Sequence, residues 1–208
     1  MSEIANEHVS NFIGLDLGPA GQFTGLAVVE QRGTLNDYGL IDGRAYAVRH
    51  LHRFPPGTPY STIVAEAQRV LAELPAANRT VVVDQTGVGQ KVFRTIRDEL
   101  SKFCVRGVTV TAGSNAAADG RGGWIVSRTD LVGAMQILLQ ERRLKIAPTL
   151  PLAPTLAGEL HQFQARAVSL AADASLEWRE RPHDDLVLAV AIAVWLAERS
   201  SGFIFRVI

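Results

Sequence analysis

The stretch Asn11-Phe12-Ile13-Gly14-Leu15-Asp16-Leu17-Gly18 decides the fold, because it is an apolar run with one carboxylate set into its middle. Apolar residues stand at both odd and even positions, which predicts a central strand covered on both faces. Asp16 is expensive to desolvate there unless a charged or hydrogen-bonding group meets it. A bound metal ion is one of the few strong partners for such a carboxylate. We therefore expect Asp16 to anchor a divalent-metal site.

The composition predicts one folded domain with no global attraction for a polyanion. The chain has 208 residues, of which 47% are hydrophobic and 20% charged, and this length suffices for one well-buried core. We expect a single domain over residues 1–208, with a loose polar tail at 1–10. The formal net charge is zero, so nucleic-acid binding would need a local basic patch. Cys104 is the only cysteine, and we expect it to be a small buried hydrophobe.

The sequence carries no targeting or membrane signal. Its first residues lack the basic and apolar regions of a signal peptide. The longest apolar run, Leu186 to Ala197, has 12 residues, whereas a membrane-spanning helix needs about 20. We expect a cytoplasmic protein that has no membrane partner.

Short apolar runs separated by turns predict five strands. Three runs joined by short loops, at residues 11–18, 24–30 and 44–54, point to an antiparallel meander. Two further runs, at 80–84 and 105–111, follow helical segments of the kind that connect parallel strands. The expected fold is α/β, with a mixed five-stranded sheet flanked by helices. Strands one to three are antiparallel, and strands one, four and five are parallel.

Apolar residues spaced at 3.6 predict the helices. The first helix is expected to begin at Tyr60 and to end before Pro75, and the second to follow the turn Gly87-Val88-Gly89. A third should begin after a cap at Ser127 or Thr129. The last two are expected over 156–164 and from Asp184-Asp185 through Ala197. The glycine-rich segment 112–123 suits a mobile loop or a small hairpin at a site. Residues 165–171 suit a short edge strand.

The predicted topology brings distant acidic residues together. The first and fourth strands can lie side by side, which places Asp16 near Asp84 at the end of the fourth strand. A helix as apolar as 186–197 must pack on the sheet, and its N-terminus carries Asp184 and Asp185. Three acidic positions then converge, although each acid alone also suits a strand end or a helix start.

Three motifs in order carry a family resemblance: G-L-D-L-G at Gly14–Gly18, V-V-V-D-Q-T-G-V-G at Val81–Gly89 and H-D-D-L-V-L-A at His183–Ala189. They resemble the nuclease domain of bacteriophage large terminase subunits, which belongs to the ribonuclease H-like superfamily with the Holliday-junction resolvases. The resemblance runs from about Phe12 to Leu196. It includes Tyr60 at a helix start, Arg128-Thr129-Asp130-Leu131 and Glu159-Leu160.

This resemblance implies a metal-dependent DNA endonuclease that hydrolyses phosphodiester bonds. Asp16, Asp84 and one of Asp184 or Asp185 would hold two Mg²⁺ or Mn²⁺ ions, about 4 Å apart. We favour Asp185 as the direct ligand because it immediately precedes the run Leu-Val-Leu-Ala, with Asp184 as a further ligand or a supporting group. Imidazole suits Mg²⁺ less well than carboxylate does, so we interpret His183 as a helix-start residue.

The same resemblance implies DNA as partner, together with a separate packaging ATPase or other phage proteins, in a bacterial or phage-infected cell. No G-x-x-x-x-G-K-[ST] phosphate loop occurs in the sequence, so we expect a nuclease domain without the ATPase motor. Five basic residues are candidates for a DNA path, although scattered surface charge is the default: Arg121, Arg128, Arg142, Arg143 and Lys145. His50 and His52 share a strand face, and without a third ligand nearby we expect them to be exposed.

Three other functions remain open at this point. A junction resolvase of the same superfamily would prefer four-way junctions over linear duplex. An actin-like nucleotide-binding protein also carries D-x-G on its first strand, but such proteins repeat the fold in two domains and are usually longer. An inactive scaffold would have kept the fold and lost metal binding.

Overall fold

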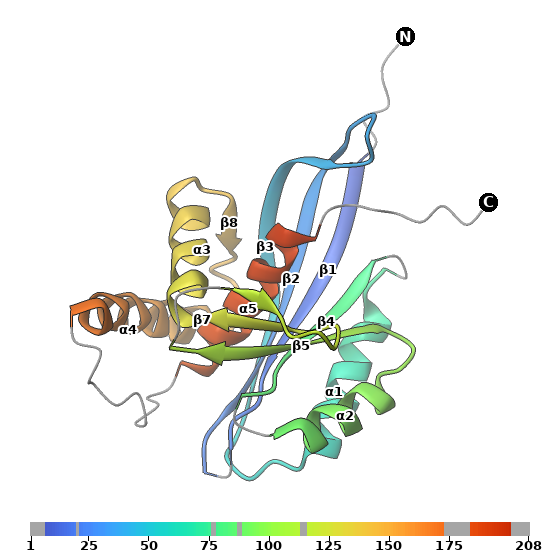
Figure 1. Ribbon diagram of the computed structural model, residues 1–208, viewed down its shortest axis with the longest axis vertical. Coiled ribbons are helices and arrows are strands. Elements are labelled where there is room, and N and C mark those ends of the chain that lie inside the picture. The colour runs from blue at the N-terminus through green and yellow to red at the C-terminus, as the bar shows by residue number, and fades with distance from the viewer. Residues whose placement is uncertain are drawn as a thin grey trace.

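The computed structural model describes residues 7–19, 21–75, 78–86, 89–112, 116–172 and 184–200. The strands are β1 (Glu7–Asp16), β2 (Thr24–Leu35), β3 (Ile41–Phe54), β4 (Arg79–Asp84), β5 (Cys104–Thr111), β6 (Ala117–Ala118), β7 (Trp124–Ser127) and β8 (Leu144–Ile146). The helices are α1 (Tyr60–Glu73), α2 (Gly89–Glu99), α3 (Arg128–Gln140), α4 (Ala153–Ala172) and α5 (Asp185–Arg199). One sheet contains the described strands in the order β6-β7-β5-β4-β1-β2-β3-β8 (Figure 1).

The middle of this sheet matches the predicted topology. β1, β2 and β3 pair antiparallel, whereas β4 is parallel to both β1 and β5. The predicted mixed α/β sheet flanked by helices is therefore confirmed. Three short strands extend it: β8 pairs with β3, β7 pairs with β5, and β6 forms a small antiparallel hairpin with β7. The glycine-rich segment 112–123 supplies β6 and the turn of this hairpin, and β7 follows directly after the segment, so the expected hairpin is only partly inside it.

Several local predictions were wrong. β1 begins at Glu7, so residues 7–10 are not part of a loose tail; the buried side chains of His8 and Ser10 satisfy each other through a 2.8 Å hydrogen bond. Residues 1–6 lie outside the described residues. Cys104 is exposed rather than buried, because it is the first residue of β5. Residues 165–171 are not an edge strand but continue α4, in line with their alanine content.

Alternation along the strands divides the core between two faces of the sheet. Phe12 and Val82 pack with α5 and α3 on one face, whereas Ile13 and Val83 pack with α1 on the other. Figure 1 shows α1 and α2 together on one side and α3, α4 and α5 on the other. Every residue of α5 from Asp185 to Ala197 is buried, as its apolar sequence predicts. None of the described helices is long and apolar enough to cross a membrane.

Two glycines let α5 approach the sheet backbone. A Cβ on Gly14 would stand 1.9 Å from the carbonyl oxygen of Ala189, and one on Gly25 would stand 2.3 Å from that of Asp185. Real Cβ atoms essentially never come this close to a backbone oxygen. The first turn of α5 therefore rests directly on the backbone of β2.

Candidate functional site

Asp16 and Asp84 occupy matched positions at the ends of two neighbouring parallel strands. They are register partners in the β1–β4 ladder, and strands in a sheet lie about 4.8 Å apart. Alternation places both side chains on the α5 face, since Phe12 and Val82, an even number of residues earlier, belong to the core on that face. Each residue is 3% exposed. The first part of the predicted convergence is thus present in the fold.

The start of α5 adds two further buried acids on the same face. Asp185 is its first residue and Asp184 occupies the N-cap position, and they are 5% and 7% exposed. The backbone of Asp185 packs on Gly25, which is the antiparallel register partner of Asp16. Asp16 is therefore flanked in the sheet by Asp84 on one side and, on the other, by the residue that supports Asp185.

Two arginines meet the acids of α5. Arg53 Nη2 lies 2.5 Å from Asp185 Oδ1 and 3.3 Å from Glu159 Oε1, and its guanidinium stacks over the ring of Phe23. Arg128 forms an ion pair with Asp184. Asp184 occupies the N-cap position of α5, as the helix-start alternative expected, but its side chain makes no capping hydrogen bond to the helix. Arg53 was missed by the sequence analysis because only the alternation of β3 directs it toward α5.

Glu159 is a buried acid to which the sequence analysis gave no role. Its Oε2 accepts hydrogen bonds from the backbone amides of Leu186 and Val187, both at 3.0 Å, and so satisfies the first turn of α5. Burial, reinforced by the charge of Asp185, raises the pKa of Glu159 to about 7. An acid among the apolar positions of α4 could have pointed to Glu159 from the sequence. The family resemblance also included Glu159-Leu160.

A local turn fixes the side chain of Asp84. Its Oδ1 accepts the backbone amide of Thr86 at 2.8 Å and also the hydroxyl of Thr86. The same hydroxyl accepts the amide of Val110 at 2.7 Å, which ties the turn to β5. This is the Asx-type arrangement that aspartate favours after a strand. Gly87, Val88 and His183, which the sequence analysis also considered, lie outside the described residues.

The chemistry of these acids fits a hard divalent cation. Carboxylate oxygens are the ligands that Mg²⁺ and Mn²⁺ prefer. Asp185 Oδ2 is buried and has no hydrogen-bond partner among the described residues. The carboxylates are not yet gathered as ligands, however. Within the described ranges, the group of three side chains whose ligand atoms all lie within 4.8 Å of one another is a different one: His50, His52 and Glu66.

That group corrects the expectation for His50 and His52. Both residues are half-buried, and Glu66 of α1 stands beside them as the third possible ligand that the sequence analysis did not find. Sequence spacing alone does not show that Glu66, on the helix after β3, lies beside the two histidines of that strand.

The five basic candidates for a DNA path do not line one surface. Arg142, Arg143 and Lys145 lie between α3 and β8 or in β8, at one edge of the sheet, whereas Arg121 precedes β7 near the other edge. Arg143 also forms an ion pair with Glu198: its Nη1 and Nη2 lie 2.9 and 3.2 Å from Glu198 Oε1 and Oε2. Arg128 is paired with Asp184 at the start of α3.

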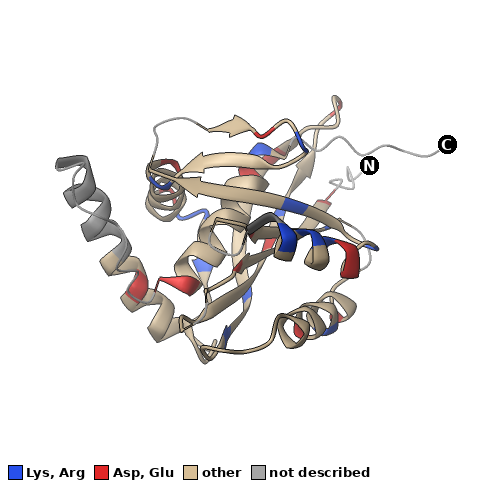
Figure 2. Cartoon of the chain, turned by 60° about the horizontal axis from the view of Figure 1, so that its bottom comes forward, with Lys and Arg blue, Asp and Glu red and all other residues tan. Residues whose placement is uncertain are grey.

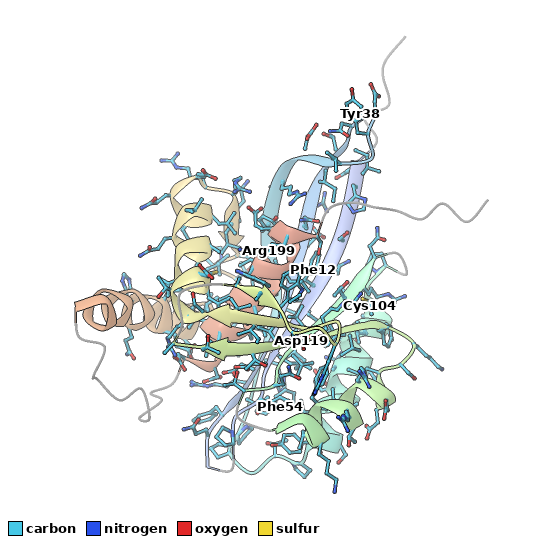
Figure 3. All side chains as sticks on the ribbon, in the orientation of Figure 1. Phe12, Tyr38, Phe54, Cys104, Asp119 and Arg199 are labelled. Atoms are coloured by element: carbon cyan, nitrogen blue, oxygen red, sulfur yellow. The ribbon has the colours of Figure 1, made fainter. Side chains whose placement is uncertain are left out.

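Arg121 instead shares a pocket with three arginines that the sequence analysis missed. These line it with Gln85, Phe93 and the loop 119–123: Arg94, Arg97 and Arg106. Figure 2 shows the basic positions on α2 and β5. Asp119, labelled in Figure 3, shapes the loop by accepting the amides of Arg121 and Gly123 at 2.7 and 2.8 Å.

Among solved structures, the chain is similar to the large terminase nuclease from thermophilic phage G20c. The TM-score is 0.53 at 18% identity, over 89% of this chain and 81% of that chain. A match to NurA bound to dAMP and manganese has a TM-score of 0.20 at 9% identity, over 92% of this chain and 52% of that one, and carries no argument. No family model and no curated protein matches the sequence. The chain therefore has a terminase nuclease-like, ribonuclease H-like fold.

Proposed function

We propose that this chain is a divalent-metal-dependent endonuclease that hydrolyses DNA phosphodiester bonds. Asp16, Asp84 and Asp185 would be its metal ligands, and Asp184 a further ligand or a supporting group. The observation that carries the proposal is the register match of Asp16 with Asp84, on the face of the sheet where Asp185 opens α5. The terminase nuclease-like fold supports the same reaction class.

The electrostatics of the site favour cation binding. Burying several carboxylates together is costly unless positive charge compensates them. Arg53 and Arg128 compensate the acids of α5, and Asp185 Oδ2 still has no hydrogen-bond partner among the described residues. Bound Mg²⁺ or Mn²⁺ would supply an activated water and stabilise the leaving 3′ oxygen.

The surrounding residues of the chain hold the ligands in place. Arg53 orients Asp185, Glu159 fixes the first turn of α5, and Thr86 orients Asp84. Because the acids do not yet stand within a common ligand distance, metal binding would rotate these side chains toward one another.

The substrate in this proposal is DNA. Since the chain has no net charge, DNA binding depends on a local patch, and the arginine-lined pocket beside Gln85 is the best candidate. Gln85 directly follows Asp84, although alternation turns its side chain toward the opposite face. By likeness to a terminase nuclease, the proposal extends to a packaging ATPase or another phage protein as partner, in the cytoplasm of a phage-infected cell.

The test is cleavage of supercoiled plasmid by the full chain with Mg²⁺ or Mn²⁺, with EDTA as the negative arm. Asp16→Asn and Asp84→Asn should lower the rate at least about 100-fold, since even groups that only support a metal ligand are worth 10- to 100-fold. Asp37→Asn, at an exposed loop acid, is the matched control and should leave the rate unchanged.

The same assay separates the alternatives. Cleavage retained by Asp16→Asn, with the fold intact by circular dichroism, would contradict the ligand assignment. Preference for a four-way junction over linear duplex would favour a resolvase. Tight ATP binding by calorimetry, without cleavage, would favour the nucleotide-binding alternative.

A further inference from the structure

Two histidines of β3 face α1, on the opposite side of the sheet from the acids. His50 and His52 are paired with Val28 and Leu26 of β2, which belong to the core beneath α1. Arg53, the next residue along β3, points the other way and reaches Asp185. The histidine cluster is therefore separate from the proposed nuclease site, with the sheet between them.

Glu66 of α1 completes the cluster. The ligand atoms of His50, His52 and Glu66 all lie within 4.8 Å of one another, and His52 Nδ1 is 3.9 Å from Glu66 Oε1. Tetrahedral zinc with bonds of about 2.0–2.1 Å holds its ligand atoms roughly 3.4 Å apart. The side chains thus need only small rotations to share an ion.

His50 has a buried ring nitrogen without a hydrogen-bond partner among the described residues. Its Nε2 is buried and makes no hydrogen bond to any described residue, and such a buried polar atom is costly. The lone pair of a neutral imidazole nitrogen can bind a metal ion, and an ion at this position would supply the missing partner of His50 Nε2.

Arg69 holds the carboxyl group of Glu66 in place. Its Nη2 and Nε donate to Oε1 and Oε2 of Glu66, at 2.7 and 2.8 Å. Each carboxylate oxygen can accept more than one contact, so the ion pair leaves Oε1 able to face His52. The side chain of His52 is 40% exposed, which gives an ion a route from solvent.

We propose that His50, His52 and Glu66 form a second metal site, for Zn²⁺ or a similar borderline transition-metal ion, which ties α1 to β3. Two imidazoles and one carboxylate suit such ions, whereas Mg²⁺ prefers oxygen ligands throughout. Water would complete the coordination on the exposed side.

The test is Zn²⁺ titration of the full chain in the presence of excess Mg²⁺, which would occupy the proposed carboxylate site, read by calorimetry and by thermal unfolding. One equivalent should bind and raise Tm, because a ligand specific for the folded state stabilises it. His52→Gln and Glu66→Gln should each weaken binding at least about tenfold. His161→Gln, at an exposed histidine of α4, should bind like the wild type, and so should Asp16→Asn. Mg²⁺ in excess should not abolish this Zn²⁺-dependent shift, because Mg²⁺ prefers oxygen ligands throughout.

Wild-type affinity in His52→Gln, or no zinc binding at all, would overturn the proposal. Co²⁺ added to the wild type decides the matter even if a variant fails to fold. The expected result is the absorption of four-coordinate Co²⁺, removed by one equivalent of Zn²⁺. Absence of that spectrum would also overturn the proposal. Zinc binding retained by an inactive Asp16→Asn would keep this site distinct from the nuclease assignment.

Discussion

The backbone carbonyl of Asp185 lies directly over Gly25, at a position where a Cβ on Gly25 would be 2.3 Å from its oxygen. Gly25 is also the register partner of Asp16. A residue without a side chain thus lets the start of α5 settle beside the strand that carries the first acid.

Gly25→Ala should destabilise the fold and impair the proposed nuclease together. The added methyl group must push α5 away from β2, and overpacking of this kind costs about 1–3 kcal/mol or more. Urea unfolding and plasmid cleavage would measure the two effects. The control is Gly133→Ala in α3, where a Cβ meets nothing within 4 Å. It should stabilise the helix by about 0.5–1 kcal/mol. An unchanged Gly25→Ala variant would show that α5 is not seated as described.

Arg53→Met should lower the free energy of unfolding by about 3–5 kcal/mol, because it leaves Asp185 and Glu159 buried without their positive partner. Urea unfolding without divalent ions is the measurement. Arg49→Met on the same strand is the matched control. Arg49 pairs with Glu30, but the arginine side chain is half exposed, so Arg49→Met should change the free energy of unfolding by no more than about 1 kcal/mol. Equal effects of the two substitutions would contradict a structural role for Arg53.

Glu198 should make stability depend on acid pH. Burial alone would raise its pKa, but hydrogen bonds from Arg143 and Tyr46 outweigh burial and lower the pKa of Glu198 below the ordinary 4.5. Its contribution is therefore complete above pH 4.5 and is lost as pH falls through the lower, folded-state pKa. At pH 7, Glu198→Gln should lower the free energy of unfolding by about 1.5–3 kcal/mol.

The difference between the wild type and Glu198→Gln should shrink as unfolding is followed from pH 7 down to acid. Glu73→Gln, at an exposed partner of Arg69, should show no such trend. A constant difference between wild type and Glu198→Gln at all pH values would mean that the ion pair with Arg143 does not stabilise the fold.

Arg106→Ala, in the arginine-lined pocket, should weaken DNA binding and lower the salt slope of log K by about 1. Fluorescence anisotropy with a labelled duplex at several salt concentrations would measure both. Arg142→Ala, near the β8 edge, should change neither. The reverse pattern would place the DNA path along β8 instead.

The sequence could predict the central strands and the acids at their ends, because burial on both faces of β1 and β4 leaves a strong pattern around Asp16 and Asp84. It could not predict Arg53 or Glu159 as partners of α5, since their contacts join residues far apart in the chain. Strands as short as β6 and β8 are too brief to show periodicity. An apolar run such as 165–171 suits a strand or a helix equally, and here the continuation of α4 decided it.

The ion pairs of Arg53 with Asp185 and of Arg128 with Asp184 mean that the protein carries internal counterions for its own acidic centre. We therefore expect the chain to fold without bound metal. A chelator should abolish the proposed cleavage without unfolding the chain, and a bound cation would replace part of the positive charge that the arginines now supply.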